Sequence, residues 1–422
     1  MKKLLFFFVA TAIVVACSEK EALNMEFPIP AKQQVNNIRS FEEALEVAQK
    51  SIELLNCGDS STTRGTMTRM IDTDNSKIYR KKTTRSSSSF PNDTLMYIFN
   101  FNDNQGFAIV SASYSTEELI AVTEKGHFDP NISSEIEGFN LFMEMAEKYI
   151  ANSTTQRGPF DPIQPPYLDS IVDINIQRGP YVTVQWGQTH PEGEYCPNGI
   201  SGCVNTAMAQ IMSYYNYPLS IDLTYDNADI SVQALNWTDI KTHQTGHLLN
   251  TCSTPDTHKA IGRLCRQLGY MNNSSYGTNI TTTLYNNAVS TMASLGYSIP
   301  NNISFDFNSI MNQLNSQHLF MITGSRIGES VGHAWVLDGY KYIETGFYRL
   351  EPIGLNGEWI ITDSNVTITR LCHYNWGWYG DCNGYFSAGV FDTQAGVLYD
   401  GAHIADRDYC VYVRLYPMYY TQ

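Results

Sequence analysis

The chain is poor in charged residues, and in basic ones above all. Only 16% of its 422 residues are charged, and 27 Lys and Arg stand against 42 Asp and Glu, which gives a formal net charge of −15. A strongly acidic chain is repelled by nucleic-acid phosphates and by anionic lipid headgroups. Neither nucleic acid nor an anionic membrane surface is therefore expected as a partner.

The N-terminus has an apolar run that is too short to cross a bilayer as a mature helix. It extends over 13 residues from Leu4 to Ala16 and follows two lysines. The letters Val14-Val15-Ala16-Cys17 resemble a bacterial lipobox. We expect residues 1–16 to be removed as a lipoprotein-type signal peptide. Lipid on Cys17 would then anchor the exported protein to the cell envelope or surface without spanning the membrane. An ordinary signal peptide with an incidental cysteine is the alternative.

The chain is long enough for two domains, each with its own core. No internal repeat of the kind that builds solenoids or propellers is present. Apolar residues at helical spacing predict helices over 41–55 and 135–151. Apolar runs at 96–101 and 107–112, on either side of a Gly-containing turn, predict a β-hairpin. A first α+β domain is therefore expected over residues 17–156.

Two polar stretches interrupt this pattern. Residues 58–89 are rich in Ser and Thr and are typical of an exposed flexible loop. Residues 152–166 are polar, contain Pro and Gly, and offer Arg157-Gly158-Pro159 as a basic processing site. We expect a second domain over 157–422. Cutting at this site would release that domain from a lipid on Cys17.

One cysteine lies at the N-terminus of a predicted helix. Apolar residues at helical spacing across 204–212 predict a helix that ends before Pro218. Cys203 lies in its first turn, where unpaired N–H groups and the helix dipole favour the thiolate, which is the nucleophilic form. The alternative interpretation is a small buried residue with no chemical role.

A histidine and an asparagine follow at intervals suited to nucleophilic catalysis. His333 stands at the entrance of a short apolar run, 332–339, that predicts a buried strand ending in a turn. Asn375 lies in an aromatic, Gly-rich stretch. His333 is suited to remove the thiol proton and to protonate the leaving amine, and Asn375 to hold the imidazole in one tautomer. Trp376 is placed to cover that pair and exclude water.

A glutamine upstream of the cysteine is the candidate oxyanion donor. The side chain of Gln188 and the backbone N–H of Cys203 would form a donor pair for a tetrahedral intermediate, and each such donor contributes about 3–4 kcal/mol in related chemistry. Gln185 competes for this role. Gln188 is preferred because it stands on the cysteine side of Trp186-Gly187, where the chain must turn toward the helix.

A second histidine and two cysteines near Asn375 are interpreted as structural. His373 is two residues before Asn375, too close in sequence to face Cys203 across a cleft. Cys372 and Cys382 do not have the spacing of a compact zinc-ligand pair. Two thiols that brace a loop, or a disulfide between them, are expected instead. The sequence predicts no metal and no other cofactor.

Together these stretches resemble the streptopain family of papain-like cysteine peptidases. The order Cys, His, Asn is that of papain-like hydrolases, and the resemblance covers most of residues 175–415. The matching stretches are Trp186-Gly187-Gln188, Cys196-Pro197, Gly202-Cys203-Val204, Thr206 to Met212, Gly332-His333-Ala334 and Asn375-Trp376-Gly377-Trp378.

The resemblance implies a papain-like α+β fold, in which a helical subdomain and an antiparallel sheet subdomain face each other across a cleft. It implies endopeptidase activity on proteins or peptides, with Cys203 as nucleophile and His333 as base. Secretion as a zymogen, silenced by its own N-terminal propeptide, is implied as well. Substrate contacts are expected at Gly332 and Trp376. Thr281 is the counterpart here of a Gly/Ser-rich substrate loop in the family.

Two other functions remain open at this stage. The same Cys-His chemistry can transfer an acyl group to an amine, as in a transglutaminase-like transferase or an amidase. A surface adhesin or inhibitor built on a catalytically silent scaffold is the non-enzymatic alternative.

Overall fold

The computed structural model describes the chain in two regions. We use "N-terminal region" for residues 38–151 and "C-terminal region" for residues 168–421. The predicted signal peptide, the lipidation site Cys17 and the predicted processing segment 152–166 lie outside the described residues. The structure describes 38–56, 69–80, 94–131, 134–151, 168–242, 255–326, 332–353, 358–391 and 411–421.

The N-terminal region is a small antiparallel sheet between two amphipathic helices. Alternating side chains of its strands pack on α1 on one face and on α2 on the other. The predicted helices and hairpin are confirmed as α1, α2 and the β2–β3 pair. The elements are α1 (Phe41–Asn56), η1 (Thr73–Asn75), β1 (Lys77–Arg80), β2 (Thr94–Asn100), η2 (Asn102–Asn104), β3 (Phe107–Ser111), β4 (Leu119–Thr123) and α2 (Glu137–Ala151).

The prediction of one continuous flexible loop over 58–89 is wrong for residues 69–80. Asp72 caps η1 by accepting hydrogen bonds from the backbone N–H groups of Asp74 and Asn75. The following residues pair with β2 as strand β1. Pairing with an apolar strand outweighs the polar composition of the segment. The remainder of the stretch lies outside the described residues.

The helical subdomain is built around α3, which begins at the predicted cysteine. Gly202, its N-cap, has a φ of +87°, and a Cβ there would lie 3.0 Å from the side chain of Thr281. Only glycine adopts this backbone readily, so Gly202 fixes how the chain enters the helix. The elements are α3 (Cys203–Tyr215), β6 (Ser220–Asp222), β7 (Val232–Ala234), α4 (Trp237–Thr242), α5 (Pro255–Met271), β8 (Ser275–Tyr276), β9 (Thr281–Thr282) and α6 (Tyr285–Ser294).

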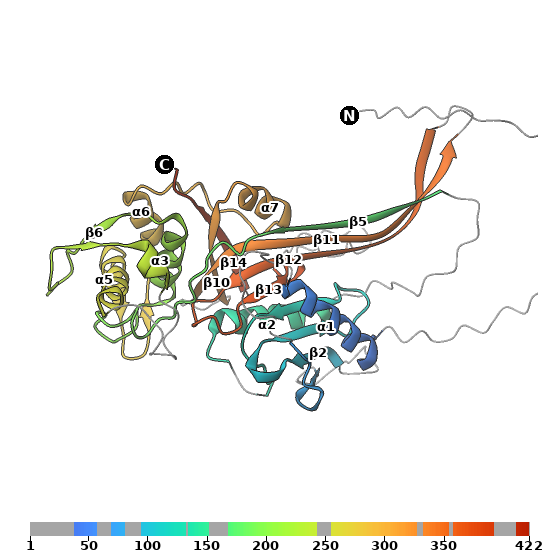
Figure 1. The fold of residues 1–422 in the computed structure, drawn as a ribbon, viewed down its shortest axis with the longest axis horizontal. Coiled ribbons are helices and arrows are strands. Elements are labelled where there is room, and N and C mark those ends of the chain that lie inside the picture. Colours follow the sequence, from blue (N-terminus) through green and yellow to red (C-terminus); the bar gives the residue numbers. More distant parts are fainter. Residues whose placement is uncertain are drawn as a thin grey trace, which may run out of the picture. The chain divides into compact units, whose positions relative to one another are not determined.

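The sheet subdomain follows the helical one along the chain except for its strand β5, which precedes it. Its long β11–β12 hairpin, with β5 paired along β11, runs beyond the other strands as a three-stranded arm (Figure 1). The elements are β5 (Leu168–Arg178), α7 (Phe307–Asn315), β10 (Leu319–Arg326), β11 (His333–Ile353), β12 (Glu358–Asn375), β13 (Gly384–Ser387), η4 (Ala388–Val390) and β14 (Val411–Met418).

The prediction of a short strand that ends in a turn after His333 is wrong. Leu337 lies opposite Tyr374 and Gly339 lies opposite His373, so Asp338 is the extra residue of a β-bulge. The strand then continues to Ile353. An Asp-Gly pair is a common turn signal, but here the ladder resumes on its far side because a long partner strand is available.

One sheet runs through both regions of the chain. Its strand order is β1-β2-β3-β4-β13-β12-β11-β10-β14, with β5 on β11. The two regions join where β4 pairs antiparallel with β13, placing Thr123 opposite Gly384 and Ala121 opposite Phe386. The N-terminal region therefore covers what would otherwise be an open sheet edge of the C-terminal region.

Alternation along β10 and β11 gives this sheet two buried faces. One face packs with α2 and α7 in a core to which both regions contribute, here called the shared core. The other packs against the helical subdomain in the helical core. Shared-core residues of the two strands are Phe320, Ile322, Trp335 and Leu337, and helical-core residues are Leu319, Met321, Ala334 and Val336.

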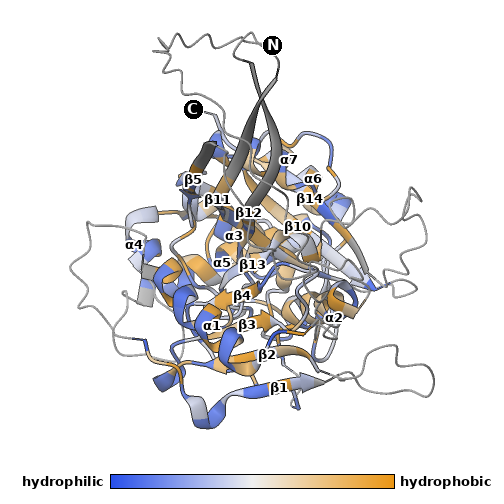
Figure 2. Cartoon of the chain, turned by 90° about the vertical axis from the view of Figure 1, so that its right-hand side faces the viewer, coloured by the Kyte–Doolittle hydropathy of each residue, from blue (hydrophilic) through white to orange (hydrophobic). Residues whose placement is uncertain are grey.

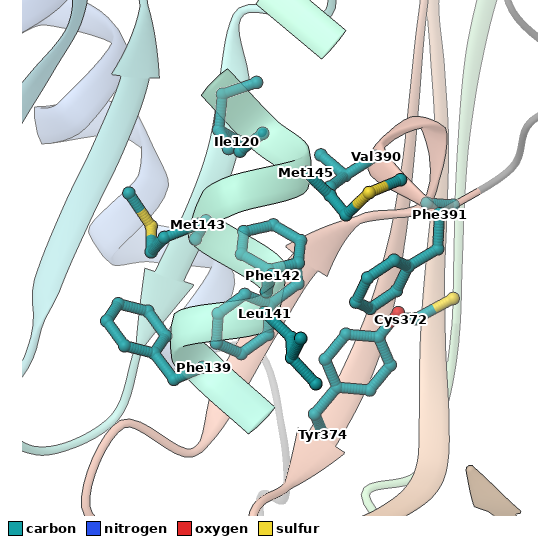
Figure 3. Packing of buried hydrophobic residues seen from close by; sticks show 14 of the residues in the cluster. Ile120, Phe139, Leu141, Phe142, Met143, Met145, Cys372, Tyr374, Val390 and Phe391 are labelled. Carbon is teal, nitrogen blue, oxygen red and sulfur yellow. The ribbon is translucent and has the colours of Figure 1, made fainter. Parts of the chain in front are cut away.

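The shared core is aromatic, and α2 supplies one side of it. Phe142 of α2 lies beside Tyr374 and Phe391 of the C-terminal region in Figure 3, and its ring centre is 5.6 Å from that of Phe391. Figure 2 shows hydrophobic residues concentrated in β2, β3 and β4, the strands between the two helices of the N-terminal region. Separating the regions would expose this surface to water.

Cys372 and Cys382 are both buried and form no disulfide with each other, so the disulfide alternative for this pair is not realised. Cys372 packs in the shared core and is drawn above Tyr374 in Figure 3. Cys196 and Cys265 are also buried. Within the described ranges, no helix has both the length and the apolar character needed to cross a membrane.

Candidate active site

Five of the sequence-predicted site residues line one cavity of about 600 Å³ at the N-terminus of α3. They are Gln188, Cys203, Thr281, Gly332 and His333. Residues from three parts of the chain therefore meet here: the segment before α3, the β9 loop and the start of β11. The N-terminal region also reaches this cavity, because Glu135 and Glu137 form part of its wall. Asn375 and Trp376 are not among its lining residues.

Cys203 lies partly buried in the first turn of α3. Burial raises the pKa of its thiol to about 11, although hydrogen bonds from the backbone N–H groups of Ala334 and Val204 favour the thiolate. The negative charge of Glu137 raises this pKa further. The helix N-terminus alone predicts a lowered pKa, and here burial outweighs it.

His333 opens β11 and is buried, with 3% of its surface exposed. Its Nδ1 lies 3.8 Å from a carboxylate oxygen of Glu137, and its Nε2 has no hydrogen-bond partner among the residues that the structure describes. Burial lowers the pKa of His333 to about 4, and a hydrogen bond with the backbone of Trp376 offsets this only in part. At neutral pH the imidazole is therefore uncharged.

The N-terminus of α2 packs directly on this histidine. A Cβ on Gly138 would lie 2.8 Å from the His333 ring and 2.6 Å from Trp376, so only glycine lets the helix approach this closely. With Glu137 on one side and Gly138 on the other, the imidazole is enclosed by the N-terminal region. Sequence reasoning missed both residues, because nothing local to 135–138 marks a contact with a strand some 200 residues away.

Asn375 is buried on the other face of the sheet. It lies opposite Val336, which belongs to the helical core, whereas His333 shares the face of Trp335. Its side-chain N–H donates to the Val184 carbonyl at 2.9 Å, and its oxygen accepts from Gln210 of α3 at 2.9 Å. In this structure the Asn375 amide therefore joins β12 to α3 and to the segment before α3.

Trp376 is fully buried beside His333. Its indole N–H donates to the Cys382 carbonyl at 2.9 Å. Its ring lies edge-on to Phe139 of α2, with 6.4 Å between ring centres. Trp378, two residues further on, lines the cavity instead.

The two candidate glutamines have different surroundings. Gln188 lines the cavity, and its carbonyl accepts a hydrogen bond from the backbone N–H of Ser201 at 2.8 Å. The side chain of Gln185 lies against Gly380, where a Cβ would come within 2.6 Å of its amide carbon. Of the two, only Gln188 belongs to the same cavity wall as Cys203.

Two of the predicted substrate contacts, Thr281 and Gly332, line the cavity. The hydroxyl of Thr281 donates to the Ile200 carbonyl at 2.8 Å, which ties β9 to the chain just before α3. Gly332 immediately precedes His333, and a Cβ there would lie 2.3 Å from the hydroxyl oxygen of Tyr285. Tyr285 is thus a further wall residue that the sequence did not indicate.

The buried His373 is separate from this cavity. Its Nδ1 lies 2.6 Å from Asp338, and its Nε2 lies 3.5 Å from Glu124 of the N-terminal region. Among the residues that the structure describes, no group of His, Cys, Asp and Glu has the arrangement of a metal site.

A helical subdomain with a cysteine at the head of its central helix faces a sheet subdomain with a histidine at the head of a strand. This is the α+β papain-like fold of cysteine peptidases, preceded here by a small α+β domain. Comparison of the sequence with known proteins shows which families the two domains are similar to.

Two family models match the chain. Residues 185–386 match the peptidase C10 family, and residues 32–150 match the Spi protease inhibitor family. The chain is 26% identical over 341 residues to streptopain of Streptococcus pyogenes, which covers 71% of this chain and 75% of that protein. It is 25% identical over 361 residues to the thiol protease/hemagglutinin PrtT of Porphyromonas gingivalis, covering 75% of this chain.

The fold is also that of a solved precursor. A fragment of prointerpain A from Prevotella intermedia matches 82% of this chain and 99% of its own length, with a TM-score of 0.51 at 18% identity. Over residues 185–386 the chain is similar to the peptidase C10 family, the streptopain family, and over residues 32–150 it is similar to a domain of the protease-inhibitor type. It spans 36% of the length of the Porphyromonas protein.

Proposed function

We propose that this protein is a cysteine endopeptidase made as a zymogen. The observation that carries the proposal is the single cavity that holds Cys203 at the N-terminus of α3 and His333 at the start of β11. The match of residues 185–386 to the peptidase C10 family supports the same reaction class. Cys203 is the nucleophile, and His333 is the general base and acid.

The reaction follows from these roles. His333 takes the thiol proton, and the Cys203 sulfur attacks the peptide carbonyl carbon. The tetrahedral oxyanion accepts hydrogen bonds from the Cys203 backbone N–H and the Gln188 side chain. The protonated imidazole gives its proton to the amine as the C–N bond breaks, which leaves a thioester. Water, deprotonated by His333, then attacks the thioester and returns the thiol.

Asn375 and Trp376 act on the histidine in this proposal. Asn375 orients the imidazole once it has moved toward Cys203, and Trp376 shields it from water. The protein or peptide substrate lies along the cavity and contacts Gly332 and Thr281, and it reaches Trp376 once α2 has left that side chain. A chain segment bound there would occupy the space that Glu135 and Glu137 border in the precursor.

Latency in this proposal acts mainly on the histidine. In the precursor the imidazole faces Glu137 and Gly138, and both reacting groups are neutral because burial raises the pKa of Cys203 to about 11 and lowers that of His333 to about 4. Departure of the N-terminal region would free the imidazole to turn toward the thiol. The two groups could then form the charged pair that makes a cysteine nucleophilic.

We infer that the domains run from 17 to 156 and from 157 to 422, after a signal peptide at 1–16. The lipobox-like stretch supports export with lipid attachment at Cys17 to the cell envelope, and the basic stretch at Arg157 supports processing there. A cut at Arg157 would release the C-terminal region from that lipid. Fractionation that finds the processed C-terminal region still lipid-anchored would contradict this order of events.

A thiol-directed peptide electrophile tests nucleophile and latency together. We expect it to label the wild-type chain only after limited proteolysis near Arg157, and the Cys203→Ala variant not at all. Cys265→Ala, which removes a buried thiol outside the cavity, is the matched control and should label like wild type. Equal labelling of Cys203→Ala, or no labelling of the processed wild type, would reject the assignment. Cross-linked instead of shortened protein products would point to acyl transfer.

A further inference from the structure

Asp338 is a fully buried carboxylate in the middle of the sheet, outside the cavity. It is the extra residue of the bulge in β11, so its backbone stands outside the β11–β12 ladder. Bulges turn a side chain away from the direction that regular pleating would give it. A buried carboxylate is costly unless it is hydrogen-bonded or paired, so its partners indicate why it is there.

Those partners lie in the segment that leads to Gln188. One carboxylate oxygen of Asp338 accepts a hydrogen bond from the Val182 N–H at 2.7 Å. Its backbone carbonyl accepts one from the Tyr181 N–H at 3.1 Å. The other carboxylate oxygen lies 2.6 Å from Nδ1 of His373.

Residues 181–186 form no helix or strand, so side chains and loops must hold them in place. The Val184 carbonyl accepts from Asn375 at 2.9 Å, the Trp186 carbonyl from Gln210 at 3.4 Å, and the Gln188 carbonyl from Ser201 at 2.8 Å. Asp338 supplies the first of these attachments. The segment from Val182 to Gln188 is thereby attached at every second residue.

His373 extends this attachment to the N-terminal region. Burial by itself lowers its pKa, but the charge of Asp338 and the proximity of Glu124 raise it to about 10, so it is an imidazolium at neutral pH. Its Nε2 lies 3.5 Å from Glu124, which directly follows β4. Lys341 and Arg69 are the other charged groups that act on Glu124.

We propose that Asp338 is a positioning residue for the peptidase reaction, which orients Gln188 by anchoring the segment 181–188, and that His373 links this anchor to the N-terminal region through Glu124. The inference rests on the proposed function, since it requires Gln188 to act as an oxyanion donor. It assigns a role to two buried charges that lie outside the cavity.

The first test uses the full-length precursor after limited proteolysis, with a fluorogenic peptide as substrate. Asp338→Ala should lower kcat by about a hundredfold and change KM by no more than about twofold, because it displaces a group that acts in the transition state. Asp338→Asn retains an acceptor for the Val182 N–H and should recover activity to within about tenfold of wild type. Unchanged kcat in Asp338→Ala would overturn the proposal.

A double-mutant cycle shows whether Asp338 acts through Gln188. In a Gln188→Ala background, Asp338→Ala should lower kcat by less than about threefold, because the group that it positions is already missing. The same hundredfold loss in that background would overturn the inference. If Asp338→Ala fails to fold, His373→Gln tests the same anchor by removing its cation. A wild-type enzyme that does not cleave peptides would instead contradict the proposed function.

The link to the N-terminal region is tested in the precursor. Glu124→Gln should shorten the lag before activity appears by about three- to tenfold, because it removes a partly exposed charge from the ion pair. Its kcat after processing should equal that of wild type. Glu118→Gln is the matched control, since Glu118 pairs within the N-terminal region with Arg39 at 3.9 Å. An unchanged lag for Glu124→Gln would overturn the link.

Discussion

The two walls of the cavity differ in what holds them together. The wall with Cys203 belongs to the helical core, whose buried residues all come from the C-terminal region, between Val182 and Met418. The wall with His333 lies against the shared core, to which the N-terminal region contributes aromatic residues of α2 and β3. The proposed nucleophile, Cys203, therefore stands on a scaffold whose buried residues come from the C-terminal region.

This difference locates the latency of the precursor. The N-terminal region continues the sheet at β13 and packs α2 on the imidazole, whereas its described residues that line the cavity of the thiol are the carboxylates Glu135 and Glu137. Removing the N-terminal region changes the surroundings of His333 far more than the backbone of α3. The proposed base, His333, is thus the group whose geometry depends on the precursor state.

The largest effect is expected at Cys203, and it tests whether the cavity wall that carries this residue is stable without the thiol. Cys203→Ala should reduce peptide hydrolysis by at least about 10⁴-fold after processing, because no nucleophile remains. Its unfolding midpoint in denaturant should match that of a precursor kept inactive by a reversible thiol block. A large change in that midpoint would mean that the thiol also supports the wall.

The second prediction compares one residue from each core. Phe142→Ala, in the shared core, and Leu264→Ala, in the helical core, should each destabilise the precursor by about 2–5 kcal/mol because each leaves a cavity. Only Phe142→Ala should shorten the lag before peptide cleavage begins. Equal lags in the two variants would show that latency does not depend on the shared core in particular.

The third prediction concerns pH. The pKa of His333 is about 4 in the folded precursor, below its ordinary 6.5, because the residue is buried. The folded state therefore binds fewer protons than the unfolded chain between these values, and stability falls as pH drops from 6.5 toward 4, by about 1–3 kcal/mol in total. Denaturant unfolding of the Cys203→Ala precursor at several pH values between 6.5 and 4 measures this loss of stability. In the double variant Cys203→Ala/His333→Gln, the free energy of unfolding should depend less steeply on pH. If its curve runs parallel to that of Cys203→Ala, His333 is excluded as the cause of the pH dependence.

The smallest effect is expected at the charge nearest the histidine. The Glu137 side chain is 62% exposed and 3.8 Å from the imidazole, so its interaction is screened by water. Glu137→Gln should change the free energy with which the N-terminal region binds the C-terminal region by less than about 1 kcal/mol. The measurement is the lag before activity in the precursor. A lag shortened as much as in Phe142→Ala would mean that charge, not packing, encloses the base.

Local patterns predicted the elements that carry their own signal. The helix from Cys203, the helices α1 and α2 and the β2–β3 hairpin follow from apolar periodicity within short windows. The Asp-Gly pair at 338–339 misled, because a turn and a bulge share the same local chemistry and only the partner strand distinguishes them. Strand β1 escaped prediction because its polar sequence is ordered by pairing with β2.

The sequence alone determined the chemical candidates, the order Cys203, His333, Asn375, and the division into an α+β domain and a papain-like domain. These depend on residue types and local periodicity, which the chain displays directly. Only the tertiary structure decided that β4 extends the sheet at β13, that Gly138 lies against His333 and that Asp338 is buried against Val182. Such contacts join residues far apart in the chain, and burial, which sets the pKa values of Cys203 and His333, exists only once the chain has folded.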